Sequence, residues 1–337
     1  MIPILEVENL HVHFFLDEGV VRAVDGVSFS VEAGKTLGIV GESGSGKSVI
    51  GQSILRIVPP PGRIVNGRIL LQLDGDNGEQ ERLDLTGLDP YGRRARSIRG
   101  RDVAMIFQEP MNSFSPVHTV GSQIIEALSL HGDVSGAEAR NRAIEMLARV
   151  GIPQPELRID AYPHELSGGM RQRAMIAMAL VCRPRILIAD EPTTALDVTI
   201  QAQIIDLLQS LQEEFGMAII FISHNLGVIS EISDDVLVVY FGRAMESAPV
   251  DVIFEQPLHP YTRALLRSIP SIDTPVRTHL DTIEGTLPDP FANIPGCPFF
   301  GRCLECEGKT VCRDEPYELT LVGERHYIAC PRICVAA

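Results

Sequence analysis

The chain has 337 residues, enough for one large domain and one small one, with the composition of an ordinary soluble α/β protein. Its formal net charge of −15 argues against a nucleic-acid partner, because phosphate contacts need clustered Lys and Arg. The longest apolar stretch, Ala174–Cys182, is about half of what spans a bilayer, and the N-terminus lacks a signal-peptide layout. We therefore expect the chain to stay in the cytosol and to reach a membrane only through a partner.

The first 40 residues alternate short apolar runs with glycines, as at Leu5–Val7, Val20–Val21 and Val27–Val31. Alternation of this kind predicts an antiparallel β layer. Two later runs, Ile64–Leu73 and Asp102–Phe107, are expected to form further strands.

A complete phosphate-binding loop follows the apolar run that ends at Val40. Its residues are Gly41, Glu42, Ser43, Gly44, Ser45, Gly46, Lys47 and Ser48. The strand before it and the helical stretch Val49–Val58 after it are the context that this motif requires. The glycines let backbone N–H groups surround a phosphate, Lys47 reaches the terminal phosphates and Ser48 can hold Mg²⁺. The sequence thus predicts a nucleoside triphosphate site.

Helical spacing dominates from about Pro116 to Cys182. Two compact apolar runs then follow, Ile186–Ala189 and Ala218–Ile222, joined by a predicted helix at Ile200–Phe215. Strand, helix and strand after a nucleotide loop indicate a doubly wound α/β core. A last strand is predicted at Asp235–Tyr240, and a domain boundary at about 250–260, where Pro, Gly and Cys become frequent.

The strand predicted at Ile186–Ala189 ends in two carboxylates, Asp190 and Glu191. Asp190 can hold the Mg²⁺ shell, and Glu191 can polarise a water for attack on the γ-phosphate. Alone, such a pair is often only an acidic turn after a strand. Downstream of a phosphate loop, the catalytic interpretation is favoured.

A second anion site is indicated by Ser167, Gly168 and Gly169, which precede a helical stretch at Arg171–Val181. The simpler interpretation is an N-cap alone. Two phosphate-type sites in one ATPase domain suggest that each binds a different ATP, which implies a head-to-tail dimer.

The segment Leu166–Met170 resembles the signature motif of ATP-binding-cassette (ABC) proteins, and further family elements occur in order. The resemblance implies that Gln108 contacts Mg²⁺ and the attacking water and relays to a transmembrane subunit. It also implies that Asp197 lies at the dimer contact and that His224 contacts the γ-phosphate. Phe14 matches the aromatic residue that stacks on adenine, with neighbouring Phe15 as the alternative.

The same resemblance implies a domain plan in the α/β class. Residues 1–255 would be the P-loop ATPase domain, with a RecA-like core, the antiparallel β layer and a helical subdomain at about 112–182. Residues 256–337 would form a small Cys-rich C-terminal domain.

Two features resemble the oligopeptide/dipeptide importer branch in particular: Met170 in the signature segment, and the element His259-Pro260-Tyr261-Thr262. The resemblance implies an ATPase that uses ATP and Mg²⁺ to power import of peptides or related small cargo at the cytoplasmic face of the inner membrane. Its implied partners are two transmembrane permease subunits, an extracytoplasmic substrate-binding protein and a second related ATPase, although a homodimer stays open.

Six of the seven cysteines crowd into residues 297–334, which in a reducing cytosol favours a metal or cluster site over disulfides. Four thiolates satisfy either a [4Fe–4S] cubane or a tetrahedral Zn²⁺. Paired C-x₂-C knuckles are missing, and the family resemblance favours the iron–sulfur cluster, with Zn²⁺ as the alternative. The expected ligands are Cys297, Cys303, Cys312 and Cys330, with Cys306 as a substitute; Cys334 is a further extra thiol.

The competing hypothesis is a soluble ABC ATPase that acts on nucleic acid, because some DNA-repair members combine this ATPase with cysteine metal sites. The acidic net charge and the importer-like C-terminal region, residues 256–337 (called the tail below), argue against it. The sequence leaves the cargo open among dipeptides, oligopeptides, glutathione and nickel chelates.

Overall fold

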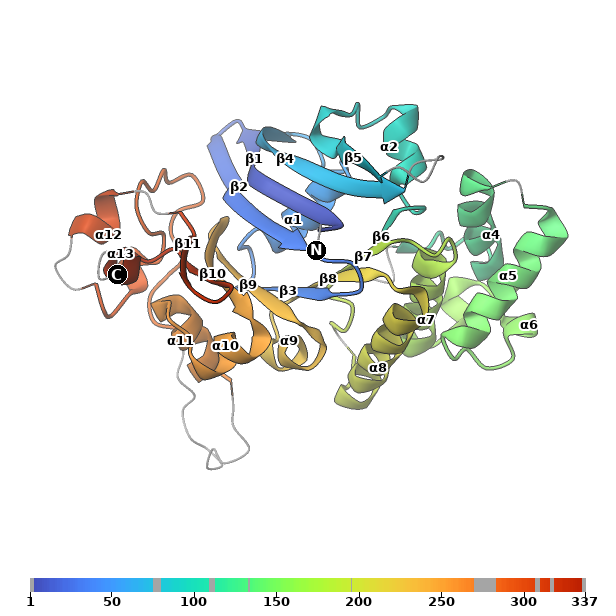
Figure 1. Cartoon of the computed structure of the whole chain (residues 1–337). Coiled ribbons are helices and arrows are strands. Elements are labelled where there is room, and N and C mark those ends of the chain that lie inside the picture. The colour runs from blue at the N-terminus through green and yellow to red at the C-terminus, as the bar shows by residue number, and fades with distance from the viewer. Residues whose placement is uncertain are drawn as a thin grey trace. The chain divides into compact units, whose positions relative to one another are not determined.

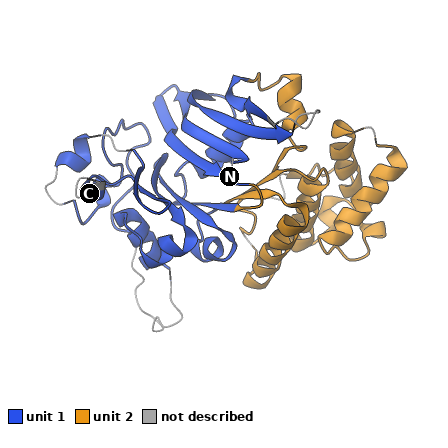
Figure 2. Cartoon of the chain, viewed as in Figure 1, with its two compact units in different colours: residues 1–32, 36–87, 222–337 blue, residues 33–35, 88–221 orange. Residues whose placement is uncertain are grey.

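A computed structural model describes residues 3–74, 80–108, 113–132, 134–194, 196–269, 283–306, 310–315 and 318–334 (Figure 1). The chain forms two compact units (Figure 2). The first contains residues 1–32, 36–87 and 222–337, and the second contains residues 33–35 and 88–221. The C-terminal residues thus belong to the same unit as the phosphate loop. The division at about residue 255 stays a prediction.

The antiparallel β layer predicted at the N-terminus lies in the first unit, with strand order β2-β1-β4-β5. Its strands are β1 (Leu5–Leu16), β2 (Gly19–Val31), β4 (Gly62–Asp74) and β5 (Gln80–Asp84). β1 and β2 are longer than the apolar runs suggested. Irregularities in their pairing, one of them between Val7 and Leu10, interrupt the alternation and make each strand look like two short ones.

The second sheet of this unit has the order β11-β12-β10-β9-β3 within the unit. The predicted strands β3 (Thr36–Val40) and β9 (Asp235–Tyr240) are present and pair in parallel. β10 (Arg243–Pro249), β12 (His326–Ile328) and β11 (Thr320–Gly323) extend the sheet in antiparallel fashion. The last two come from the tail, where the sequence showed no clear period.

The helices of the first unit are short. They are α1 (Lys47–Ile54), α9 (Leu226–Ile232), α10 (Val250–Glu255), α11 (Pro260–Arg267), α12 (Thr310–Asp314) and α13 (Pro331–Cys334). α1 ends earlier than the predicted Val58, because Arg56 adopts a left-handed backbone conformation (φ 57°) that no α-helix continues.

The second unit contains the parallel pair β6 (Val103–Ile106) and β7 (Ile186–Asp190), with β8 (Ala218–Ser223) beside β7. The last two residues of β8 belong to the first unit. All residues of β6, β7 and β8 are buried, as predicted for parallel strands covered on both faces.

The second unit also contains the helices α2 (Arg93–Ile98), α4 (Val120–His131), α5 (Gly136–Arg149), α6 (Pro155–Arg158), α7 (Gly168–Leu180) and α8 (Val198–Phe215). Thr119 and Ser135 cap α4 and α5 by accepting backbone hydrogen bonds from the first turn. α4, α5 and α7 pack against one another. The helical subdomain at about 112–182 stays a prediction, because the compact unit that contains these helices spans residues 88–221.

Within the described residues, no helix has both the length and the apolar character needed to cross a membrane. Cys182 is the one cysteine outside residues 297–334. It follows the end of α7 and is only partly buried, and its thiol donates to the Ala127 carbonyl at 3.6 Å.

Candidate functional site

The phosphate loop connects β3 to α1 in the first unit and is closed around its own lysine. The Lys47 ammonium donates to the carbonyls of Gly41 and Glu42, at 2.9 Å each, and its side chain is almost fully buried. Two glycines are required by close packing. A Cβ on Gly41 would lie 2.0 Å from the Val239 carbonyl oxygen, and one on Gly46 would lie 2.1 Å from that of Ala23. The loop is therefore built to present its backbone and Lys47 to an anion.

The two aromatic candidates for adenine stacking have different surroundings on β1. The Phe14 ring lies where a Cβ on Gly62 would be only 2.6 Å from it, so that glycine makes room for the ring. Phe15 is 38% exposed, and the Arg63 guanidinium lies 4.1 Å from its ring centroid. Since Arg63 covers one face of Phe15, Phe14 remains our candidate.

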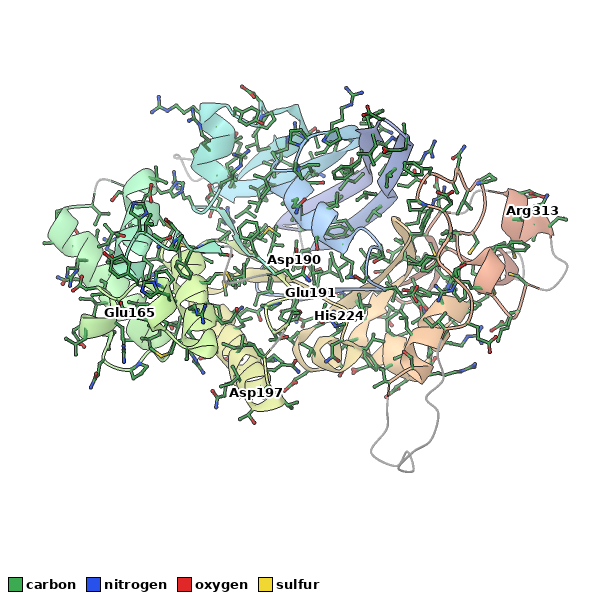
Figure 3. All side chains as sticks on the ribbon, turned by 180° about the vertical axis from the view of Figure 1, so that it is seen from behind. Glu165, Asp190, Glu191, Asp197, His224 and Arg313 are labelled. Atoms are coloured by element: carbon green, nitrogen blue, oxygen red, sulfur yellow. The ribbon has the colours of Figure 1, made fainter. Side chains whose placement is uncertain are left out.

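The predicted catalytic carboxylates lie at the end of β7 in the second unit (Figure 3). Asp190 is buried, with 4% of its surface exposed. Glu191 has a left-handed backbone (φ 47°), which is uncommon for a residue other than glycine and occurs often at functional sites. The Gln108 amide and the Thr194 hydroxyl both donate to Glu191 Oε2 at 2.9 Å. The fold thus joins Gln108 to Glu191 and orients the carboxylate.

Two contributing residues were missed by the sequence analysis. Thr194 holds Glu191 directly. Gln172, buried on α7, donates to the Pro192 carbonyl at 2.5 Å and so fixes the turn that follows Glu191. The available signal for Gln172 was a polar residue within the apolar face of a helix.

Ser167 and Asp197 occupy equivalent positions at the starts of α7 and α8. The Ser167 hydroxyl accepts from the Met170 amide at 3.3 Å, and the Asp197 carboxylate accepts from the Ile200 amide at 3.0 Å. Both side chains are exposed, and among the described residues nothing beyond its own helix turn lies within 4 Å of a Cβ placed on Gly168. Gly169 faces Ile200 on α8. The N-cap is present, and its exposed face stays a candidate anion site.

His224 follows β8 in the first unit and is exposed, directly before the N-cap residue of α9, Asn225. The Asn225 amide donates to the Ser223 hydroxyl at 3.0 Å, and the Asn225 side chain accepts from the Gly227 amide at 3.0 Å. The backbone that follows His224 is therefore held by hydrogen bonds.

The five described cysteines of the tail are free thiols that form one cluster. Burial raises the pKa of Cys297 to about 12, and the nearby Cys330, Cys303 and Cys312 add to the shift. Cys306 is also buried, and this burial, together with the nearby thiols of Cys312 and Cys303, raises its pKa. Cys306 is thus a full member of the cluster. The side chain of Cys334 lies outside the described residues.

The spacing of these sulfurs bears on the kind of group they fit. Among the described residues, no three of the sulfurs lie within 4.8 Å of one another. A single tetrahedral Zn²⁺ with Zn–S bonds of about 2.3 Å would bring its ligands to about 3.8 Å apart. The described sulfurs are thus not drawn together as the ligands of a single metal ion would be, and the group that they hold stays a proposal.

A group of two histidines and one carboxylate on the β layer has a structural role and is not a metal site. His11, His13 and Asp25 place ligand-type atoms within 4.8 Å of one another. Arg243, however, donates to Asp25 at 2.8 Å through Nε and lies 2.7 Å away through Nη2. Burial works to raise the pKa of Asp25, but the hydrogen bond and charge of Arg243 lower it overall. The Arg243 guanidinium therefore already neutralises the Asp25 carboxylate that a bound cation would need.

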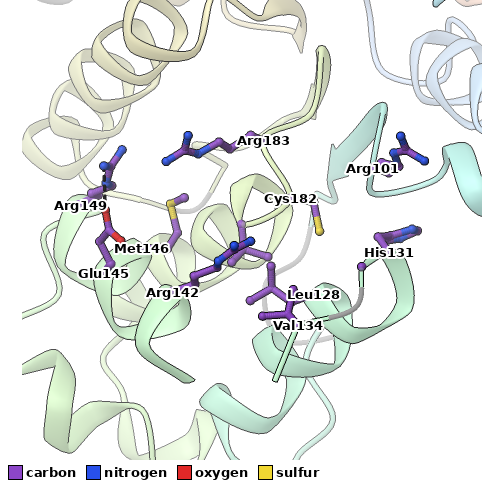
Figure 4. Close-up of a pocket in the computed structure, with 12 residues that line it drawn as sticks. Arg101, Leu128, His131, Val134, Arg142, Glu145, Met146, Arg149, Cys182 and Arg183 are labelled. Atoms are coloured by element: carbon purple, nitrogen blue, oxygen red, sulfur yellow. Dashed lines mark hydrogen bonds and ion pairs between the residues drawn. The ribbon is translucent and has the colours of Figure 1, made fainter. Parts of the chain in front are cut away.

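A cavity of about 410 Å³ lies in the second unit (Figure 4). It is mainly basic, with Arg101, His131, Arg142, Arg149 and Arg183 among its lining residues. Cys182 also lines it. None of the residues predicted for ATP chemistry does.

Three features together define a P-loop ATPase of the ABC class. A glycine loop closes around a lysine before a helix, a buried strand ends in two carboxylates, and a Ser-Gly-Gly segment begins a helix. Residues 24–194 match the ABC transporter family profile, and residues 245–312 match that of the oligopeptide/dipeptide transporter C-terminal region. The chain belongs to the ABC transporter family, as an ATP-binding protein with the oligopeptide/dipeptide-type C-terminal region.

Similar proteins agree with this assignment. The "Probable peptide ABC transporter ATP-binding protein" of Sinorhizobium fredii is 49% identical over 98% of this chain and 95% of its own. The dipeptide transport ATP-binding protein DppD of Bacillus subtilis is 46% identical over 98% and 95%. Among solved structures, the dimeric ATP-binding cassette MJ0796 in a post-hydrolysis state with ADP and Pi has a TM-score of 0.63. It is 26% identical and covers 73% of this chain and 98% of its own.

Proposed function

We propose that the chain is the ATP-hydrolysing subunit of an ABC importer for dipeptides or oligopeptides. The observation that carries the proposal is the match of residues 245–312 to the oligopeptide/dipeptide transporter C-terminal region, behind a complete ABC ATPase. Relatives named for peptide and dipeptide transport support it, because they align over 98% of the chain.

The proposed chemistry follows from the residue types. Residues 41–48 hold the phosphates of ATP, with Lys47 as the cationic anchor and Phe14 on the adenine. Mg²⁺ would be held by Ser48, Gln108 and Asp190, because their side chains offer the oxygen ligands that this ion prefers. Glu191 accepts a proton from the attacking water, and Gln108 and Thr194 keep its carboxylate oriented. His224 contacts the γ-phosphate.

The proposed assembly contains a second ATPase. The exposed helix start at Ser167, Gly168 and Gly169 binds the ATP of the other subunit, and Asp197 lies at that contact. The dimeric state of the cassette MJ0796 supports a dimer, either with a related ATPase or with a second copy. Two permease subunits and an extracytoplasmic substrate-binding protein complete the complex, which places this chain at the cytoplasmic face of the membrane.

Reconstitution tests the proposed function. Vesicles that contain the permease subunits, the chain and its partner ATPase should accumulate a labelled dipeptide or oligopeptide only with ATP and binding protein. The Lys47→Ala chain serves as the control and should give no uptake. Hydrolysis that responds to DNA and not to the permease and binding protein would instead support the nucleic-acid hypothesis.

We also propose that the tail cysteines hold a [4Fe–4S] cluster through Cys297, Cys303, Cys312 and Cys330, with Cys306 as the substitute ligand. Four thiolates are the usual ligand set of such a cluster. Bound iron would take the sulfurs as thiolates, although burial raises the pKa of Cys297 to about 12. The group would join segments of the tail that contain few regular elements.

Anaerobic purification should therefore give a brown protein with about four irons per chain. Cys312→Ser should lose most of the iron, whereas Cys182→Ser, which changes the one cysteine outside residues 297–334, should keep it. Comparing Cys306→Ser with Cys303→Ser identifies the fourth ligand. A colourless protein with one zinc per chain would refute the iron–sulfur assignment and leave the ATPase proposal unaffected.

A further inference from the structure

The phosphate loop carries an acidic side chain that should hinder its own function. Glu42, the second residue of the loop, lies between Gly41 and the residues that surround the phosphates. ATP brings several negative charges to this loop, and an unpaired carboxylate next to them would repel the ligand. The structure shows how this charge is compensated.

The compensating charge comes from the C-terminal tail. Arg302 donates to both carboxylate oxygens of Glu42, from Nη1 to Oε2 at 2.6 Å and from Nη2 to Oε1 at 3.1 Å. The Arg302 side chain is only 7% exposed, and that of Glu42 is 25% exposed. An arginine guanidinium stays charged at any pH that a folded protein meets, so this contact is an ion pair. A two-point contact of this kind is among the stronger ion pairs in proteins.

The remaining donors of Arg302 fix it in place. Nη1 donates to the Tyr240 hydroxyl at 3.1 Å, Nη2 to the Ile283 carbonyl at 3.0 Å, and Nε to the Glu284 carbonyl at 2.9 Å. All five N–H groups of the guanidinium thus have acceptors. A side chain with no donor left over has one favoured position, and Glu42 is held there with it.

A second residue beyond the ATPase core holds the backbone at the same point. The Glu42 amide donates to the Tyr261 hydroxyl at 2.9 Å, and Tyr261 is fully buried. Its ring packs against Tyr240 and Phe299, with centroids 4.6 and 5.2 Å away. The tail therefore holds Glu42 both by its side chain and by its backbone.

We propose that Arg302 and Tyr261 are positioning residues for ATP binding, which act through Glu42. Arg302 neutralises the acidic residue of the phosphate loop, and Tyr261 fixes the loop backbone at that residue. The proposal rests on ATP binding at residues 41–48, and it gives the C-terminal region a direct part in the ATP site. Cys303, which follows Arg302, lies in the cysteine cluster, so a group bound there would be one residue away from this contact.

The test compares ATP affinity in four full-length chains: the parent, Arg302→Gln, Glu42→Gln and the double variant. Arg302→Gln should bind ATP roughly tenfold more weakly, since a charge-assisted pair is lost and a carboxylate is left beside the phosphates. The double variant should recover most of the affinity, because the repelling charge is gone as well. The loss in Arg302→Gln should also shrink at high salt. A purely structural role for Arg302 would predict neither the recovery nor the salt effect.

Arg313→Gln is the matched control, because Arg313 lies in the same tail, is exposed and pairs with the adjacent Asp314 (Figure 3). It should bind ATP as the parent does. Tyr261→Phe removes the hydroxyl that accepts from the Glu42 amide, and it should also weaken ATP binding. This variant tests the proposal if Arg302→Gln does not fold. Affinity of Arg302→Gln within twofold of the parent, or a double variant as weak as Arg302→Gln, would overturn the proposal. A parent chain that binds no ATP would instead refute the proposed function.

Discussion

Replacing Glu191 by Gln should keep ATP binding and lower ATP turnover in the assembled transporter by roughly 10²–10⁴-fold, the usual loss when a general base is removed. The amide has the same shape as the carboxylate and can still meet the Gln108 and Thr194 donors that contact Glu191 Oε2. It cannot accept a proton from the attacking water. The measurement is steady-state phosphate release, together with nucleotide affinity.

Two further variants serve as controls for Glu191→Gln. Glu145→Gln changes an exposed carboxylate of the same unit that pairs with Arg149, and it should leave turnover unchanged. Lys47→Ala should abolish nucleotide binding itself, because it removes the cation that the loop is closed around. Turnover at the parent rate in Glu191→Gln would show that Asp190 and Glu191 form only a structural turn after β7.

Replacing Ser167 by Arg should leave nucleotide binding by the isolated chain intact and abolish hydrolysis in the complex. The Ser167 hydroxyl is exposed at the start of α7, where we propose that it meets the ATP of the opposite subunit. A long cationic side chain there would block that approach. Nucleotide affinity of the monomer and hydrolysis by the reconstituted complex are the two measurements.

The folding role of Ser167 needs its own control, because the hydroxyl also caps α7. Ser135→Arg removes an equivalent cap from α5 and should lower the free energy of unfolding by about 1 kcal/mol. The folded Ser135→Arg chain should hydrolyse ATP in the complex at the parent rate. If both variants lower hydrolysis equally, or if Ser167→Arg loses nucleotide binding in the monomer, then Ser167 serves only the local fold.

Much of the fold was predictable wherever a short stretch of sequence determines its own backbone. The apolar runs at β3, β7, β8 and β9 predicted buried strands, and Ser167 was recognisable as a helix start. The phosphate loop was equally clear from its spacing of glycines and lysine. The structure gives the reason for two of these glycines, because Gly41 and Gly46 leave no room for a Cβ. The long strands β1 and β2 were less clear, because bulges interrupt the alternation on which the prediction depends.

The sequence by itself therefore determined the class of ATPase, the phosphate loop, the acidic end of β7 and the presence of a cysteine cluster. Only the tertiary structure decided that Gln108 holds Glu191, that Cys306 is part of the cluster, and that Arg302 neutralises Glu42 across 260 positions of the chain. The reason is physical. A loop or a cap depends on the dihedral angles of a few neighbouring residues, whereas a contact between distant residues depends on how whole strands and helices pack.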